Sequence, residues 1–129
     1  MMSAPTFKKK ERIVSNLLIE TLFGKGHSQS LSAYPLRAVY IQTEHSEGCA
    51  PVQILISVPK KRFKHAVDRN RVKRQIREAY RHHKQILEGT VAEGKQLLIA
   101  FIWLADRHYQ TQEVEKRVVN ILQRMASAS

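Results

Sequence analysis

The chain has 129 residues, of which 22 are Lys or Arg and 11 are Asp or Glu, so its formal net charge is +11. This length is typical of one domain, and an apolar content of 43% is too high for a disordered basic tail. A single cysteine, Cys49, excludes an internal disulfide framework and a zinc site built from several cysteines.

The first predicted helix begins after Ser15, a suitable N-cap, and ends at Gly24 and Gly26. Its apolar residues recur at helical spacing: Leu18, Ile19, Leu22 and Phe23. Residues 27–36 are predicted as a polar loop. Residues 37–43, rich in β-formers, are predicted as a strand. Alternating apolar residues predict a second strand over residues 52–58, ended by Pro59.

Residues 68–87 form the clearest predicted helix. Its apolar stripe consists of Val72, Ile76, Ala79, Tyr80, His83, Ile86 and Leu87. A separate arc of the same helix is basic and contains Lys73, Arg74, Arg77, Arg81 and Lys84.

The run LLIAFIWL at residues 97–104 predicts a strand buried on both faces, hence central in a sheet. It is too short to span a bilayer, which needs about 20 residues. A last helix is predicted to begin with Thr111 as its cap, and its buried side is predicted to hold Val114, Val118, Ile121, Leu122 and Met125.

These elements predict an α/β (α+β) two-layer sandwich in one domain, with a small mixed sheet and three helices in the order α-β-β-(β)-α-β-α, the strand in parentheses being optional. Residues 1–7 and 126–129 are predicted to be frayed tails. We expect neither a membrane span nor a secretory signal, and therefore a cytoplasmic protein.

The positive charge is concentrated in one segment. Residues 60–84 contain eleven Lys or Arg and only two acids, a net charge of +9, which leaves +2 for the rest of the chain. A patch of one sign and this density repels itself, so the segment favours binding to a nucleic acid over a merely solvated face.

Two adjoining motifs resemble the protein subunit of bacterial ribonuclease P. Ser57-Val58-Pro59-Lys60-Lys61 ends a strand, and Ala66-Val67-Asp68-Arg69-Asn70-Arg71-Val72-Lys73-Arg74 opens the basic helix. The resemblance extends over roughly residues 8–124 and includes Phe23-x-x-Gly26 and Tyr40. At Ile19 the chain departs from several relatives, which have Phe there.

The resemblance implies a fold like the second domain of ribosomal protein S5, with a left-handed strand–helix–strand crossover. It implies an auxiliary subunit that assists removal of the 5′ leader from precursor tRNA, while a large RNA subunit carries out catalysis. The expected partners are that RNA subunit and precursor tRNA, with no membrane and no obligate protein partner. Mg²⁺ would be held by the RNA and substrate, with none bound stably by the protein, which is expected to have no catalytic residue.

Two binding surfaces are implied. The helix is expected to dock on the RNA subunit through Arg69, Asn70, Arg71, Lys73, Arg74, Arg77 and Arg81. Arginine forks suit phosphate oxygens. For Asn70 a combined structural and binding role is favoured, because it lies between two Arg, and a simple cap or turn residue is the alternative. The leader of precursor tRNA is expected to contact Ile19, Phe23, Arg37, Tyr40, Gln53, Ser57, Lys60 and Lys61. Phe23 and Tyr40 could stack on unpaired bases or simply pack in the core.

Other functions are less well supported by the residues. A protein nuclease needs clustered carboxylates or a placed acid/base pair, and the acids are scattered. His82 and His83 are adjacent on a helix and point about 100° apart, so they do not share a metal easily. A membrane-surface or calmodulin-like helix would lose the apolar face that the core needs. The alternative that composition leaves open is a generic RNA-binding or ribosome-associated protein.

Overall fold

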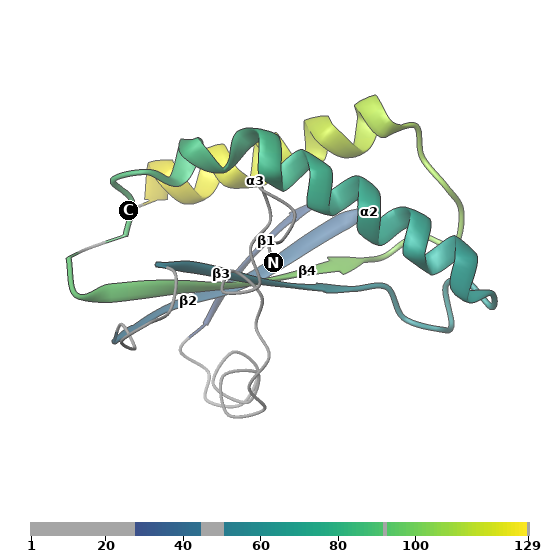
Figure 1. The fold of residues 1–129 in the computed structure, drawn as a ribbon, viewed down its shortest axis with the longest axis horizontal. Coiled ribbons are helices and arrows are strands. Elements are labelled where there is room, and N and C mark those ends of the chain that lie inside the picture. Colours follow the sequence, from purple (N-terminus) through teal and green to yellow (C-terminus); the bar gives the residue numbers. More distant parts are fainter. Residues whose placement is uncertain (1–27, 45–50, 92, 129) are drawn as a thin grey trace, which may run out of the picture.

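A computed structural model describes residues 28–44, 51–91 and 93–128 of the chain. Within them the molecule has two layers, a four-stranded sheet with two long helices covering one of its faces (Figure 1). The first predicted helix, with Ile19 and Phe23, and also Cys49 lie outside the described residues.

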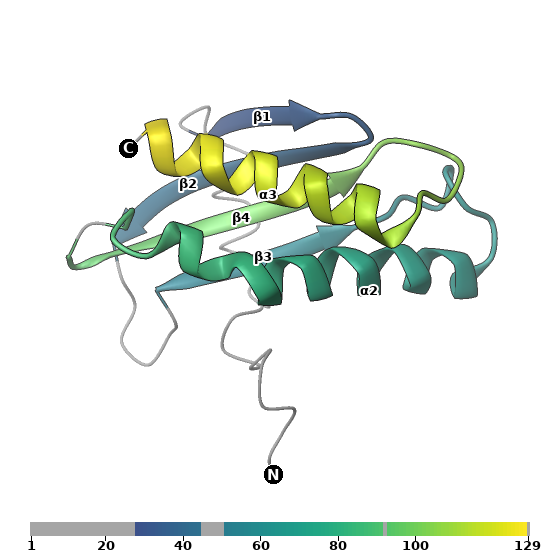
Figure 2. The same cartoon turned by 90° about the horizontal axis from the view of Figure 1, so that it is seen from above.

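The sheet contains β1 (Gln29–Ala33), β2 (Leu36–Glu44), β3 (Val52–Ser57) and β4 (Lys95–Trp103), in the spatial order β1-β2-β4-β3. β4 pairs antiparallel with β2 and parallel with β3, so the sheet is mixed as predicted. The parallel pair is connected by the basic helix, which crosses over the sheet from one strand to the other (Figure 2).

The predicted loop over residues 27–36 is wrong, because β1 occupies most of it. β1 pairs with β2 through a tight hairpin at Tyr34-Pro35. It is an edge strand with the mostly polar and exposed sequence QSLSA, so it lacks the apolar alternation that reveals a strand. The optional strand of the expected order therefore comes before the 37–43 strand, and not directly before the long helix.

The two helices differ from their predicted ends by a few residues. α2 (Ala66–His83) begins two residues earlier than predicted, and its last turn tightens into the 3₁₀ segment η2 (Lys84–Leu87). α3 (Thr111–Ala128) continues through residues predicted as a tail. The cap is not Thr111, since the Gln110 carbonyl accepts the first helical N–H groups. The Thr111 hydroxyl instead accepts a hydrogen bond from Gln75 Nε2 at 3.1 Å.

The main core lies between the helices and the sheet, and most predicted core residues are in it. All five apolar residues predicted for the last helix are at most 2% exposed. The predicted apolar stripe is confirmed at Val72, Ile76, Ala79 and Tyr80 of α2 and at Leu87 of η2. His83 is only half-buried, and the polar Gln75 is buried in its place on the side that meets α3.

β4 is buried on both faces, as its unbroken apolar run predicts. Ile99, Phe101 and Trp103 point to the helices, whereas Leu98 and Ala100 form a second cluster with Val39 on the opposite face. The sheet thus separates two surfaces with different surroundings. No helix in the described part of the chain is long and apolar enough to cross a membrane.

We predict that Ile76→Ala lowers the free energy of unfolding by about 2–5 kcal/mol, because it removes a fully buried side chain from the layer contact. Val67→Ala is the matched control on the same helix, since Val67 is 73% exposed, and it should change stability by less than about 0.5 kcal/mol. Urea denaturation of both variants measures the difference. Equal losses would show that α2 is not anchored at Ile76.

Candidate RNA-binding surfaces

The first candidate surface is the outer side of α2. Its inner side packs on the core, and Gln75 ties one flank to α3 through bonds of 3.1 Å to the Tyr109 carbonyl and the Thr111 hydroxyl. At about 100° per residue, Lys73 and Arg77 lie on the other flank. Asn70, Arg71 and Arg74 are exposed along the outer ridge between the two flanks.

The helix start decides what Asn70 can do. His65 is the N-cap, and its carbonyl already accepts the N–H groups of Asp68 and Arg69, at 3.1 and 3.3 Å. Asn70 lies beyond them in the second turn and is exposed, so it is not a cap. Its side chain is available on the same surface as Arg71 and Arg74.

Arg69 has a different environment from its basic neighbours. Its Nη1 donates to the carbonyls of Phe63 and Lys64, at 2.9 and 3.1 Å. The guanidinium therefore turns back from the ridge and holds the turn that precedes α2. This geometry makes Arg69 primarily a positioning residue for that turn.

The turn at residues 59–65 carries Lys60 and Lys61 and is fixed by several contacts besides Arg69. Phe63 is buried and stacks on His108, with ring centroids 4.6 Å apart. His108 Nε2 in turn lies 3.0 Å from Asp68 Oδ1 in the first turn of α2. Sequence reasoning missed His108, because its partner Asp68 is 40 residues away and His108 itself belongs to no recognisable motif.

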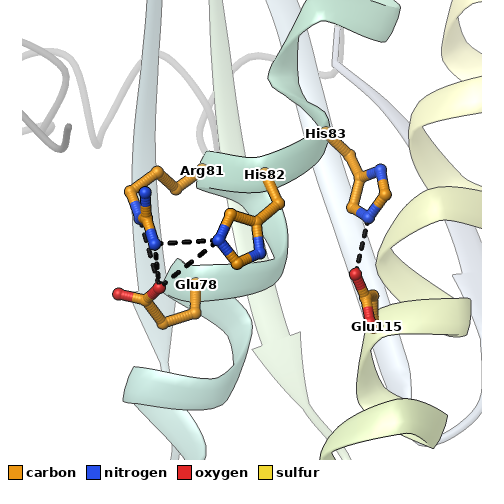
Figure 3. A network of polar contacts seen from close by, with 5 residues as sticks. All are labelled: Glu78, Arg81, His82, His83 and Glu115. Carbon is orange, nitrogen blue, oxygen red and sulfur yellow. Dashed lines mark hydrogen bonds and ion pairs between the residues drawn. The ribbon is translucent and has the colours of Figure 1, made fainter.

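Arg81 is held by an acid on its own helix (Figure 3). Its Nη2 lies 2.6 Å from Glu78 Oε1 and 2.8 Å from His82 Nε2. The hydrogen bond from Arg81 lowers the pKa of the Glu78 carboxyl, which therefore stays ionised over the physiological range. A phosphate that recruits Arg81 has to compete with this carboxylate.

His82 and His83 point apart, as predicted (Figure 3). His82 is exposed, whereas His83 is half-buried and contacts Glu115 of α3 at 2.7 Å. This contact joins the C-terminal end of α2 to α3. Over the described ranges, no three His, Cys, Asp or Glu side chains gather as metal ligands.

The second candidate surface is the sheet face turned away from the helices. Arg37 and Ser57 lie on this face in one row, because both pair with Ile102 of β4. Lys60 and Lys61 follow at the end of β3 and are exposed. Gln53 lies on the same face but is 3% exposed, and its Nε2 donates to Gln96 Oε1 at 3.2 Å.

Tyr40 is not on this surface. It pairs with Ile99 and packs against the core on the helix-covered face, where its hydroxyl donates to Gln29 Oε1 at 3.1 Å. Alternate residues of a strand point to opposite faces, so Arg37 and Tyr40 are separated by the sheet. The structure therefore brings Arg37, Ser57 and Gln53 together and excludes Tyr40 from their face.

Comparison with known proteins gives a consistent family assignment. The family model described as Ribonuclease P matches residues 7–126. The chain is 42% identical over 130 residues to the "Ribonuclease P protein component" of Porphyromonas gingivalis, covering 98% of this chain and 92% of that protein. The protein of the same name from Chlorobium phaeobacteroides is 36% identical over 110 residues, covering 79% of this chain and 74% of that one.

Solved structures agree on the fold. The RNase P protein from Thermotoga maritima superposes with a TM-score of 0.64 and 22% identity, covering 88% of this chain and 96% of that one. The RNase P protein of Staphylococcus aureus gives a TM-score of 0.63 at 22% identity, with 88% and 94% covered. The mixed α/β fold with a four-stranded sheet and two helices thus matches that of these proteins.

We predict that Arg69→Ala destabilises the protein by roughly 1–3 kcal/mol, because two charge-assisted hydrogen bonds to the turn are lost. Arg71→Ala is the matched control, because Arg71 lies two residues further along the helix and is exposed. It should lower the free energy of unfolding by less than about 0.5 kcal/mol. Thermal and urea unfolding measure both. If the two variants are equally stable, Arg69 does not anchor the turn.

Proposed function

The chain belongs to the ribonuclease P protein family, the protein component of the enzyme that removes the 5′ leader from precursor tRNA, and we propose that it contributes two RNA-binding surfaces and no catalytic group. The observation that carries the proposal is the exposure of Asn70 and Arg71, from the Arg-Asn-Arg motif, together with Arg74 on the outer side of α2. The turn with Lys60 and Lys61 leads directly into this helix.

The outer side of α2 is proposed to dock on the RNA subunit. Arg71 and Arg74 are exposed there and, among the described residues, they have no hydrogen-bond or ion-pair partner. Their guanidinium groups are free to form forked bonds with phosphate oxygens. Asn70, Lys73 and Arg77 extend the surface. Arg69 and Arg81 are second in rank, because each already has partners in the protein.

The sheet face turned away from α2 and α3 is proposed to hold the 5′ leader. Arg37 and Ser57 offer polar contacts in one row, and Lys60 and Lys61 place two charges where that row ends. Gln53 and Tyr40 are weaker candidates, because one is buried and the other faces the helices. For Ile19 and Phe23, only the family resemblance supports a contact.

Catalysis is assigned to the RNA subunit, with Mg²⁺ held by that RNA and the substrate. The two acid–imidazole hydrogen bonds between separate elements of the described chain support this assignment, since each has a structural task. Asp68 and His108 brace the turn before α2, and His83 and Glu115 join the two helices. The protein's part is to neutralise phosphate charge, which lets two polyanions approach each other.

Two finer expectations accompany this function. We infer a left-handed crossover from β3 through α2 to β4. The support is Figure 2, where the helices lie in front, both strands point right and β4 lies above β3. Right-handed crossovers are the general rule, so this would be a family exception. We also expect the subunit to work in the cytoplasm, together with its precursor tRNA.

Reconstitution tests the proposed function. The purified chain alone should leave precursor tRNA intact. Added to the RNA subunit from its own source, or to that of Porphyromonas gingivalis, it should increase cleavage at the mature 5′ end at low Mg²⁺. A chain that binds RNA but gives no enhancement with either RNA subunit would instead be a generic RNA-binding protein.

We predict that Arg74→Ala weakens assembly with the RNA subunit and makes it less dependent on salt. Loss of one phosphate contact reduces the log–log salt slope by roughly 0.7–0.9. Anisotropy titrations of labelled RNA subunit at several salt concentrations measure both effects. Lys95→Gln is the control, because Lys95 pairs with Glu44 at 2.7 Å at the start of β4, away from α2. An unchanged slope in Arg74→Ala would remove α2 from the interface.

We predict that Arg37→Ala weakens holoenzyme binding to precursor tRNA by about fivefold, roughly 1 kcal/mol, the scale of one polar contact at a hydrated surface. Mature tRNA, which lacks the leader, should bind the variant and the parent equally well. Parallel titrations with the two tRNAs make the comparison. Equal losses for both would place Arg37 against the body of the tRNA and contradict the leader surface.

A further inference from the structure

A second basic site lies between the β1–β2 hairpin and α3, at the opposite edge of the sheet from β3 (Figure 2). It is an open hollow of about 430 Å³. Three basic side chains line it, those of Lys116, Arg117 and Arg124. No acidic side chain is among the described residues that line it. The motifs that indicate α2 and the leader surface include none of these residues.

Two of the three cations are oriented by the hairpin. Arg117 Nε donates to the Tyr34 carbonyl at 2.8 Å, and Arg124 Nη1 donates to the Ser32 carbonyl at 2.7 Å. Arg124 Nη1 also lies 3.2 Å from Asn120 Oδ1. Each guanidinium has five N–H donors, so most of them remain for a ligand. Neutral carbonyl and amide oxygens orient these groups without cancelling their charge.

Acidic side chains near the hollow are few. Glu113 lies one helical turn before Arg117, and no ion pair joins the two among the described contacts. Glu115 is occupied by His83 at 2.7 Å. The hollow therefore keeps a net positive charge, and its Arg side chains are already held in place. A phosphodiester fits both properties.

Tyr34 adds a flat apolar surface to the same wall. It sits at the tip of the hairpin, lines the hollow and is 61% exposed, although large apolar side chains elsewhere in the described chain are mostly covered. An exposed aromatic ring beside arginines is the combination that binds unpaired nucleotides, because the ring stacks on the base while the cations hold the backbone.

The position of the hollow favours one of the two RNAs. It opens beside α3 in the helical layer, on the same side of the sheet as α2, whereas Arg37 and Ser57 are on the opposite side. An RNA that docks on α2 can continue across the helical layer to the hairpin. A leader on the opposite sheet face would have to pass around the edge strand β1.

We propose that the hollow between Tyr34 and the Lys116, Arg117 and Arg124 side chains binds an unpaired nucleotide of the ribonuclease P RNA subunit, with its phosphodiester on the arginines and its base on the tyrosine. The proposal rests on the proposed function for the identity of the RNA. It adds a second anchor to that RNA, at the far edge of the protein from the basic flank of α2.

The test uses the full chain and labelled RNA subunit in salt-dependent anisotropy titrations. Tyr34→Ala should weaken binding about fivefold or more, and Tyr34→Phe, which keeps the ring, should bind like the parent. Lys116→Gln should reduce the salt slope by roughly 0.7–0.9. Lys95→Gln makes the same charge change at the start of β4 and should behave like the parent. Chemical probing of the RNA should show one unpaired nucleotide that Tyr34→Ala alone exposes.

Three results would overturn the inference. Parental affinity and slope for Tyr34→Ala and Lys116→Gln, with Arg74→Ala still weakened, would refute the hollow and leave the proposed function intact. Losses confined to precursor tRNA would show that the substrate occupies it. If Tyr34→Ala and Lys116→Gln weaken binding only to an acidic peptide such as polyglutamate, the hollow is a protein-binding site. If Arg74→Ala and reconstitution also have no effect, the proposed function fails as well.

Discussion

The contact between the apolar stripe of α2 and the sheet beneath it determines which side chains of the basic helix face outward. Ile76 and Val72 are fully buried, and Tyr80 is 1% exposed. Because a helix repeats every 3.6 residues, burying this stripe forces Arg71 and Arg74 to the outside. Packing of the apolar stripe thus sets the direction in which the basic side chains of α2 point, and no acidic partner is needed to orient them. A protein with a looser core would present the same charges without a defined direction.

Elements with a strong apolar period were predictable from the sequence, whereas those defined by their neighbours were not. The buried sides of α2 and α3 and the central position of β4 follow from spacing alone. β1 was missed because an edge strand needs few apolar residues. The same distinction applies to the binding sites. The Arg-Asn-Arg motif could be recognised in the sequence because its residues are consecutive. Contacts such as Arg124 with Ser32 join residues 92 positions apart and leave no local pattern.

The sheet also explains why a list of candidate leader residues cannot be read as one surface. Strand parity places Arg37 and Tyr40 on opposite faces, although they are three positions apart. Burial then distinguishes Gln53, which is bonded to Gln96, from Ser57 at the end of the same strand. A resemblance transfers residue identities, but only the register shows which of them can touch one ligand together.

The braced turn at residues 59–65 has a geometric consequence. It joins the end of β3, where Lys60 and Lys61 lie, to the start of α2, and Arg69, Phe63 and the Asp68–His108 pair hold it from several directions. On the proposed assignment, one RNA is bound on each side of this turn. The rigid turn then fixes the angle between the two surfaces, so the protein sets the orientation of the catalytic RNA relative to its substrate.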